Sequence, residues 1–191
     1  MPDIFEPQDI GPGDDSRRES EIEKLKKARI AIAYYYRQIS EDNPSDENGY
    51  TAFDQLILYE FDIANDEDVY DQIEELKEDI VFFAQMLDEG EGEIILEYQI
   101  NEDETLLRIA KGVLEGYITD DTISRWADLT SMEQIILYEF GNMEIDRMIA
   151  IKKKLKSIEL GLRGGSTISK KDDIDDDYKK IEKNDIDLNL Y

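Results

Sequence analysis

The sequence of 191 residues contains no cysteine and no histidine. Without cysteine there are no disulfides and no thiolate metal ligands, and without histidine the commonest general base and the commonest metal ligand are missing. Most enzyme mechanisms would therefore lack one of their usual catalytic residues in this chain. We therefore predict a non-catalytic protein with no cofactor and no specific metal site.

Basic residues are also scarce, since 22 Lys and Arg face 48 Asp and Glu and leave a formal charge of −26. A charge of this size keeps a protein soluble and repels the phosphates of nucleic acids and of anionic membranes. We expect no direct binding to nucleic acid. The natural partner of such a chain is a basic protein surface.

Long apolar runs are absent, because no stretch approaches the roughly 18 residues of a membrane-spanning helix. The first residues, 1–6, also lack the basic and apolar regions of a secretory signal. We expect a soluble, cytoplasmic protein that does not contact a membrane. With 40% hydrophobic residues, the middle of the chain can still bury a core.

One heptapeptide occurs twice, first as Gln55–Phe61 and again as Gln134–Phe140, with an offset of 79 residues. At this offset, residues 29–61 match the second copy at 13 of 33 positions without a gap, and Arg29 pairs with Arg108. We interpret the pattern as a tandem duplication.

Helical signals repeat in the same order in both copies. A Ser-x-x-Glu capping box at Ser20 predicts a helix to about residue 40, and Thr51 is expected to cap a helix that runs to about residue 63. Asn65 or Asp66 then precedes a heptad-like seam, the clearest helical signal in the chain. Its apolar positions are Val69, Ile73, Leu76, Ile80, Phe83 and Leu87.

The second copy predicts helices over 103–118, from Thr130 onward and over 143–163, with a loop at 123–129 that carries the only tryptophan, Trp126. Residues 93–100 fit either a helix or a short strand. The predicted fold class is all-α, a tandem duplication of a three-helix unit with about six helices and disordered charged termini.

The predicted organisation has four parts. Residues 1–18 form a flexible N-terminal arm, 19–100 a strongly acidic first helical repeat, 101–163 a second helical repeat, and 164–191 a disordered charged C-terminal tail. The acidity lies in the first repeat, whose net charge is −17 against −3 for the second.

The duplicated third helices carry charges of opposite sign. The acidic face predicted to bind a partner comprises Asp66, Glu67, Asp68, Asp71, Glu74, Glu75, Glu78 and Asp79. The basic face of the second copy comprises Arg147, Lys152, Lys153, Lys154 and Lys156. Both can be solvated surfaces. Alternatively the two helices pair within the chain or between copies in a homo-oligomer, or the acidic face docks on a basic partner.

Glu60 and Glu139 occupy equivalent positions inside apolar helices and could form a carboxylate pair for a metal or for acid–base chemistry. Helical di-iron sites need Glu-x-x-His, which this chain cannot supply. We instead interpret both as carboxylates at the edge of the core, with Arg29 and Arg108 as partners. Tyr59 and Tyr138 are expected in the core with hydrogen-bonded hydroxyls.

Tyr34, Tyr35 and Tyr36 span more than one face of a helix, so at least one ring is expected to point outward. Exposed aromatic rings beside acidic side chains are typical of protein-binding surfaces. The same rings could instead pack against the second repeat.

These features favour an acidic accessory subunit that docks on a basic partner, such as a nucleic-acid-processing enzyme in a DNA polymerase or transcription assembly. The alternative is a free-standing DNA mimic, of viral origin, that blocks nucleic-acid-binding proteins. A carboxylate-based metal enzyme is the third class and has the least support.

Overall fold

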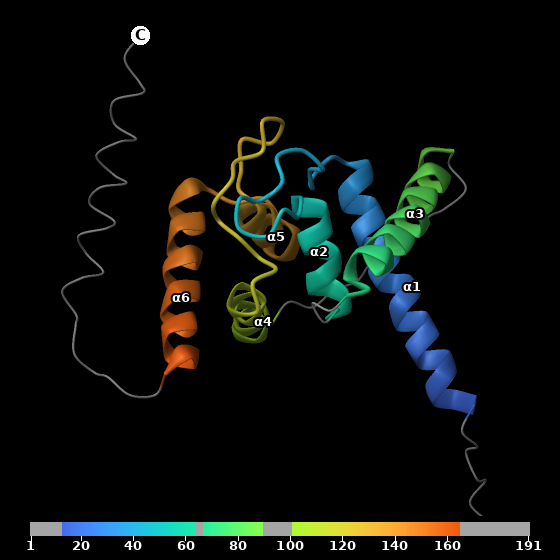
Figure 1. The fold of residues 1–191 in the computed structure, drawn as a ribbon, viewed down its shortest axis with the longest axis horizontal. Helices are drawn as coiled ribbons and strands as arrows, with labels where there is room; N and C mark the ends of the chain where they lie inside the picture. The colour runs from blue at the N-terminus through green and yellow to red at the C-terminus, as the bar shows by residue number, and fades with distance from the viewer. Residues whose placement is uncertain (1–12, 64–66, 90–100, 165–191) are drawn as a thin grey trace, which may run out of the picture. The chain divides into compact units, whose positions relative to one another are not determined.

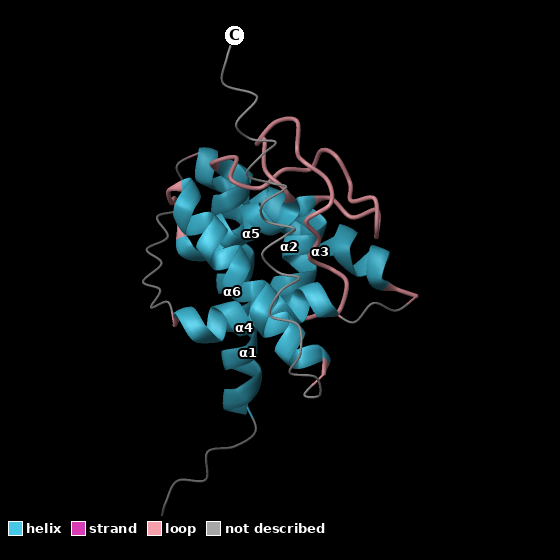
Figure 2. Cartoon of the chain, turned by 90° about the vertical axis from the view of Figure 1, so that its left-hand side faces the viewer, coloured by secondary structure: helices cyan, strands magenta, loops and turns pink. Residues whose placement is uncertain are grey.

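The computed structural model describes residues 13–63, 67–89 and 101–164, and these residues are all-α (Figure 1). Figure 2 shows helices and loops in this part of the chain and no strand. One isolated antiparallel bridge joins Ile123 and Thr130. The helices are α1 (Gly13–Tyr35), α2 (Ala52–Phe61), α3 (Val69–Asp88), α4 (Glu102–Leu114), α5 (Ser131–Phe140) and α6 (Ile145–Arg163). The described residues up to Glu159 belong to one compact unit, and the last turn of α6 belongs to a second.

Helix α1 differs most from its prediction. It begins at Gly13, so the capping box expected at Ser20 lies inside the helix and residues 13–18 of the predicted arm are helical. Asp14 and Asp15 follow Gly13, and acidic residues are favourable in the first turn of a helix, which suits the earlier start. The helix also ends at Tyr35 rather than near residue 40, because Arg37 adopts a left-handed φ of 56°. Residues 1–12 lie outside the described part of the chain, as do 93–100.

Helices α2 and α5, which contain the two heptapeptides, begin at the predicted caps. Thr51 donates its backbone N–H to Asp54 Oδ2 at 2.9 Å, and the Asp54 N–H donates to Thr51 Oγ1 at 3.2 Å. Thr130 and Glu133 form the same reciprocal box, at 2.9 and 3.3 Å. Each box satisfies two backbone N–H groups that a helix start leaves unpaired.

The heptapeptides form the centre of the core. Ile57 of α2 and its counterpart Ile136 of α5 are both fully buried, and α2 contacts α5, α1 and α3. Helix α3 lies against α1, as Figure 1 shows, and buries Val69, Ile73, Ile80 and Ala84. Of the predicted seam, Val69, Ile73 and Ile80 are thus buried, and the other three positions, Leu76, Phe83 and Leu87, are partly buried against the core. On α6 the buried positions are Met148, Ile151 and Leu155.

Polar contacts between the two halves occur in pairs at the offset of the sequence repeat. The buried amide of Gln55 accepts the N–H of Thr119 at 2.9 Å and donates to its hydroxyl at 3.0 Å. Gln134 makes the reciprocal contacts with Ser40, at 2.8 and 2.9 Å. Equivalent residues thus make equivalent contacts across the two halves, and the tandem duplication remains our interpretation of this pattern.

The same pairing occurs in the loops that precede α2 and α5. The Ser45 hydroxyl donates to Asp121 at 2.8 Å, and the Ser124 hydroxyl donates to Asp42 at 2.7 Å. At Asp42 the hydrogen bond from Ser124 has the largest effect and lowers the pKa, while burial raises it less. At Asp121 burial has the largest single effect and raises the pKa, but the hydrogen bonds together hold it below the usual range. Each half therefore fixes a loop of the other.

Replacing Gln55 by Ala should lower the free energy of unfolding by about 1–3 kcal/mol, because the buried N–H of Thr119 would lose its acceptor. Urea denaturation followed by circular dichroism measures the change. Gln134→Ala should have a similar cost, whereas Gln72→Ala, on the exposed side of α3, should change stability by less than about 0.5 kcal/mol. Equal stability of the Gln55 and Gln72 variants would contradict the assigned role.

Candidate protein-binding surface

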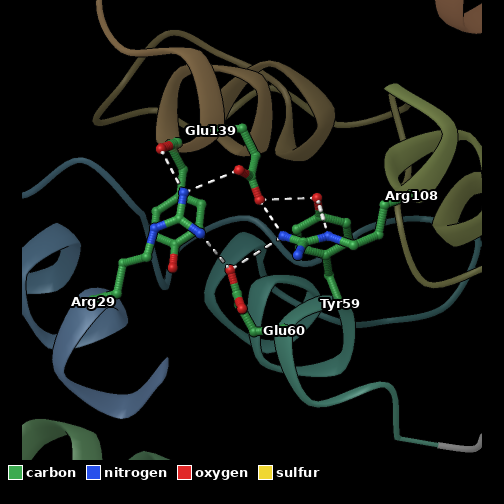
Figure 3. Close-up of polar contacts among 6 residues, drawn as sticks. Arg29, Tyr59, Glu60, Arg108 and Glu139 are labelled. Atoms are coloured by element: carbon green, nitrogen blue, oxygen red, sulfur yellow. Dashed lines mark hydrogen bonds and ion pairs between the residues drawn. The ribbon is translucent and has the colours of Figure 1, made fainter. Parts of the chain in front are cut away.

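An ionic cluster of two arginines, two glutamates and two tyrosines joins α1, α2, α4 and α5 (Figure 3). Arg29 donates to Glu60 Oε1 and to Glu139 Oε2, both at 3.0 Å. Arg108 donates to Glu60 Oε1 at 3.4 Å and forms a close ion pair with Glu139. Each carboxylate thus contacts both guanidinium groups, which confirms the predicted pairing of Glu60 and Glu139 with Arg29 and Arg108.

The tyrosines complete the cluster with their rings. The Arg29 Cζ lies 4.1 Å from the ring centroid of Tyr138, and the Arg108 Cζ lies 4.3 Å from that of Tyr59. Such stacking is favourable for a planar cation that has lost part of its hydration. The Tyr59 hydroxyl also accepts a hydrogen bond from Arg108 Nε at 2.7 Å and donates to Glu139 Oε1 at 2.9 Å.

The Tyr138 hydroxyl departs from the prediction, since it is buried without a hydrogen-bond partner of normal geometry. Arg29 stacks on the ring of Tyr138 and bonds the Tyr138 carbonyl oxygen at 3.5 Å, so it does not bond the hydroxyl as Arg108 does at Tyr59. Burial, and then the charge of Glu60, raise the pKa of Tyr138 well above its usual value.

The positive and negative charges of this cluster neutralise one another. The carboxylate side chains of Glu60 and Glu139 are 3% and 0% exposed, and two guanidinium groups balance their two charges. Burial, and then the charge of Glu139, raise the pKa of Tyr59 and keep its hydroxyl protonated. The cluster fixes the two halves to each other, and both of its carboxylates already bind arginine.

Ion pairs also connect α3 and α6 to the two capping boxes. Lys77 of α3 binds Asp54 of the first capping box at 2.8 Å, and Lys152 of α6 binds Glu133 of the second at 2.9 Å. Lys152 is therefore half-buried and engaged, although it was predicted on an exposed basic face. Lys154 binds Glu102 at 2.6 Å, so the ion pairs of α6 lead to α4 and α5. Arg147, Lys153 and Lys156 are exposed.

The Glu133 pair makes a prediction for the pH dependence of stability. Burial alone would raise the pKa of Glu133, but the Thr130 N–H and the Lys152 ammonium lower it overall. A lowered pKa stabilises the fold above the unfolded value of about 4.3, and this contribution is lost as the pH falls through the folded pKa. Glu133→Gln should therefore cost about 1 kcal/mol at pH 7. The difference should shrink as the pH falls below the unfolded value of about 4.3 in urea titrations, and a difference independent of pH would contradict this account.

The predicted acidic face is exposed wherever the structure describes it. Asp66 lies outside the described residues, and the other members are all exposed at the start and along the outer side of α3: Glu67, Asp68, Asp71, Glu74, Glu75, Glu78 and Asp79. The inner side of the same helix is apolar and packs on α1. Among these acids, Asp79 binds Lys27 of α1 at 2.6 Å, and Glu74 binds Lys77 at 3.3 Å.

The predicted tyrosine cluster divides between a groove and the open surface. Tyr34 and Tyr35 line a groove of about 710 Å³ between the end of α1, the C-terminal half of α3 and Trp126. Tyr34 stacks on Phe53 of α2, with ring centroids 5.0 Å apart. This contact lies within the first repeat, whereas the alternative prediction placed these rings against the second. Tyr36 is 66% exposed and packs edge-on against Tyr35, with ring centroids 5.0 Å apart.

Sequence reasoning missed two contributors to this groove, Trp126 and the acidic end of α3. Trp126 is 48% exposed although it is the largest side chain of the protein. Asp88 ends α3 and accepts a hydrogen bond from the Tyr35 hydroxyl at 3.3 Å. The charge of Asp88 raises the pKa of Tyr35. The only available signal was that the single tryptophan lies in a polar loop.

Two features are absent from the described residues: a membrane-spanning helix and a group of side chains that could hold a metal. In 13–63, 67–89 and 101–164, no helix is long and apolar enough to cross a membrane. In the same ranges, no three Asp or Glu side chains are grouped so that they could hold a metal ion. Comparison of the chain with protein-family models, curated proteins and solved structures gives no match.

Proposed function

We propose that the protein is a non-catalytic, acidic accessory subunit that docks on a basic surface of a partner protein within a complex that handles nucleic acid. The observation that carries this proposal is the two-sided character of α3. Its inner side is buried against α1, and its outer side presents exposed carboxylates over most of its length. A surface of this kind attracts a basic partner and speeds encounter more than it adds affinity.

The position of the charge supports docking over solubility alone. The first half of the chain, 19–100, carries a net charge of −17, and the second half, 101–163, carries −3. Solubility needs no such concentration in one half. A partner that neutralises the charge on one side of the molecule explains it, and proteins that bind DNA or RNA are the commonest carriers of large basic surfaces.

Affinity capture with charge variants tests the proposal. The docking variant carries Asp71→Asn, Glu74→Gln, Glu75→Gln and Glu78→Gln on α3. The matched control carries Asp103→Asn, Glu104→Gln, Glu144→Gln and Asp146→Asn, which are equally exposed in the second half. Tagged full-length chains are expressed in the native cell, and circular dichroism checks that each variant is folded.

The expected result is a stoichiometric basic partner that the unmodified chain and the control retain and the docking variant loses. Retention of no partner by the unmodified chain, or equal retention by both variants, would overturn the proposal.

The same exposed acids suit a second function, a DNA mimic that occupies nucleic-acid-binding sites. This function predicts inhibition of several unrelated DNA-binding proteins by the purified chain, in competition with DNA. An accessory subunit binds one partner and leaves unrelated proteins active, so the two functions separate in one competition assay.

A further inference from the structure

The groove beside Tyr35 combines exposed aromatic faces with an excess of negative charge. Tyr35 and Trp126 are both partly exposed at its walls, and Ala84 of α3 lies in the same lining. Large aromatic side chains that remain accessible in a hollow are the usual anchors of binding sites.

The charges that line the groove favour a cation. Four carboxylates, those of Glu41, Asp42, Asp88 and Glu89, face one guanidinium, that of Arg37. Of the four, Asp42 is already held by the Ser124 hydroxyl and the Arg125 N–H. Glu41 pairs with Lys77 at 3.7 Å and accepts a hydrogen bond from the Tyr34 hydroxyl at 3.3 Å, so the two acids of α3 dominate.

The end of α3 adds to the negative charge of the groove. A helix carries partial negative charge at its C-terminus, where basic side chains are favourable and acidic ones are not. Asp88 and Glu89 occupy the last and the capping position of α3, and no base is present in its last turn. Helix α4, by contrast, has Lys111 in its last turn. A bound cation would relieve this unbalanced end.

The second half of the chain provides an internal comparison. At the offset of 79 residues Tyr35 corresponds to Leu114 and Trp126 to Glu47, and at the offset of 75 residues in the third helices Asp88 corresponds to Arg163. Residues that hold the fold, such as Asp42 and its counterpart Asp121, are the same in both halves. The two aromatic residues of the groove and Asp88 are therefore not repeated at the equivalent positions, as expected for a binding site and not for a requirement of the fold.

We infer that this groove binds an arginine-bearing segment of the basic partner, an inference that rests on the proposed function. Arginine fits better than lysine for two reasons. Its planar guanidinium stacks on aromatic faces such as those of Trp126 and Tyr35, and its forked N–H groups match carboxylates in pairs. The ammonium of lysine is a point charge that keeps its hydration more strongly.

A short peptide tests the groove directly. The probe is the blocked pentapeptide acetyl-Gly-Arg-Gly-Arg-Gly-amide, with the lysine analogue as a control of equal charge. Trp126 is the only tryptophan, so its fluorescence and its single indole N–H resonance report on the groove alone. The arginine peptide should shift both signals saturably, and the lysine peptide should bind several-fold more weakly.

Variants separate the groove from the general negative charge. Asp88→Asn with Glu89→Gln should weaken the arginine peptide by about fivefold or more, and Tyr35→Leu, which installs the residue of the second half, should weaken it too. Asp71→Asn with Glu75→Gln removes equal charge outside the groove and should change the affinity less than about twofold. Phe82→Ala removes an equally exposed ring outside the groove and should have no effect.

Two results overturn the inference: an unchanged Trp126 signal at saturating peptide, or equal weakening by the two pairs of charge variants. Partner capture distinguishes this failure from failure of the proposed function. If the groove variants retain the partner and the α3 docking variant loses it, the groove inference fails and the proposed function holds. If no form of the chain captures a partner, the proposed function itself fails.

Discussion

Replacing Glu139 by glutamine is expected to lower the free energy of unfolding by about 3 kcal/mol. The Glu139 carboxylate is fully buried and binds Arg29, Arg108 and the Tyr59 hydroxyl. Its loss leaves two guanidinium groups beside one remaining carboxylate. The lower end of the usual range applies because the Arg108 side chain is 42% exposed, and solvent screens part of its charge.

Urea denaturation at neutral pH measures this loss. Glu23→Gln is the matched control, because Glu23 makes an exposed pair with Lys27 at 3.0 Å and its loss should cost less than about 1 kcal/mol. If the two variants are equally stable, the ionic cluster contributes nothing to the fold and its assigned role is wrong.

The second large effect is expected in the apolar core. Ile57→Ala and Ile136→Ala should each cost about 2–5 kcal/mol, since both side chains are fully buried at the centre of the heptapeptides and their truncation leaves a cavity. Thermal denaturation followed at 222 nm provides the measurement. Ile145→Ala should be nearly neutral, because Ile145 is 78% exposed, more than any other large apolar residue in the described part of the chain.

The unmodified chain and both core variants should each unfold in a single transition, because the glutamine contacts and the ionic cluster cross between the halves. A variant in which one half melts first while the other remains folded would show that these contacts do not couple the halves.

The sequence predicted those parts of the fold whose signals are local. The capping boxes at Thr51 and Thr130 place the starts of α2 and α5, because the residues that make each box are three positions apart. The α3 seam is readable from its spacing alone. The start of α1 was predicted wrongly because the polar stretch before Ser20 has no apolar pattern, and only the acidic residues Asp14 and Asp15 suit the first turn of a helix.

The long-range contacts could be predicted only where the residues that make them recur at the offset of the sequence repeat. Duplication of Arg29 and Glu60 at equal offsets led to the correct pairing in the ionic cluster. The groove had no such aid, because Trp126 reaches Tyr35 and Asp88 through the fold and has no equivalent aromatic residue in the first half. The position of a loop in the folded protein cannot be predicted from the spacing of residues within that loop.

The most direct test of the central claim, docking of an acidic surface on a basic partner, is the salt dependence of the affinity between the full-length chain and its captured partner. We predict that the affinity falls by about tenfold or more between about 50 and 300 mM salt, and that the docking variant of α3 shows both weaker binding and a shallower slope. An affinity that is unchanged across this range would contradict the account.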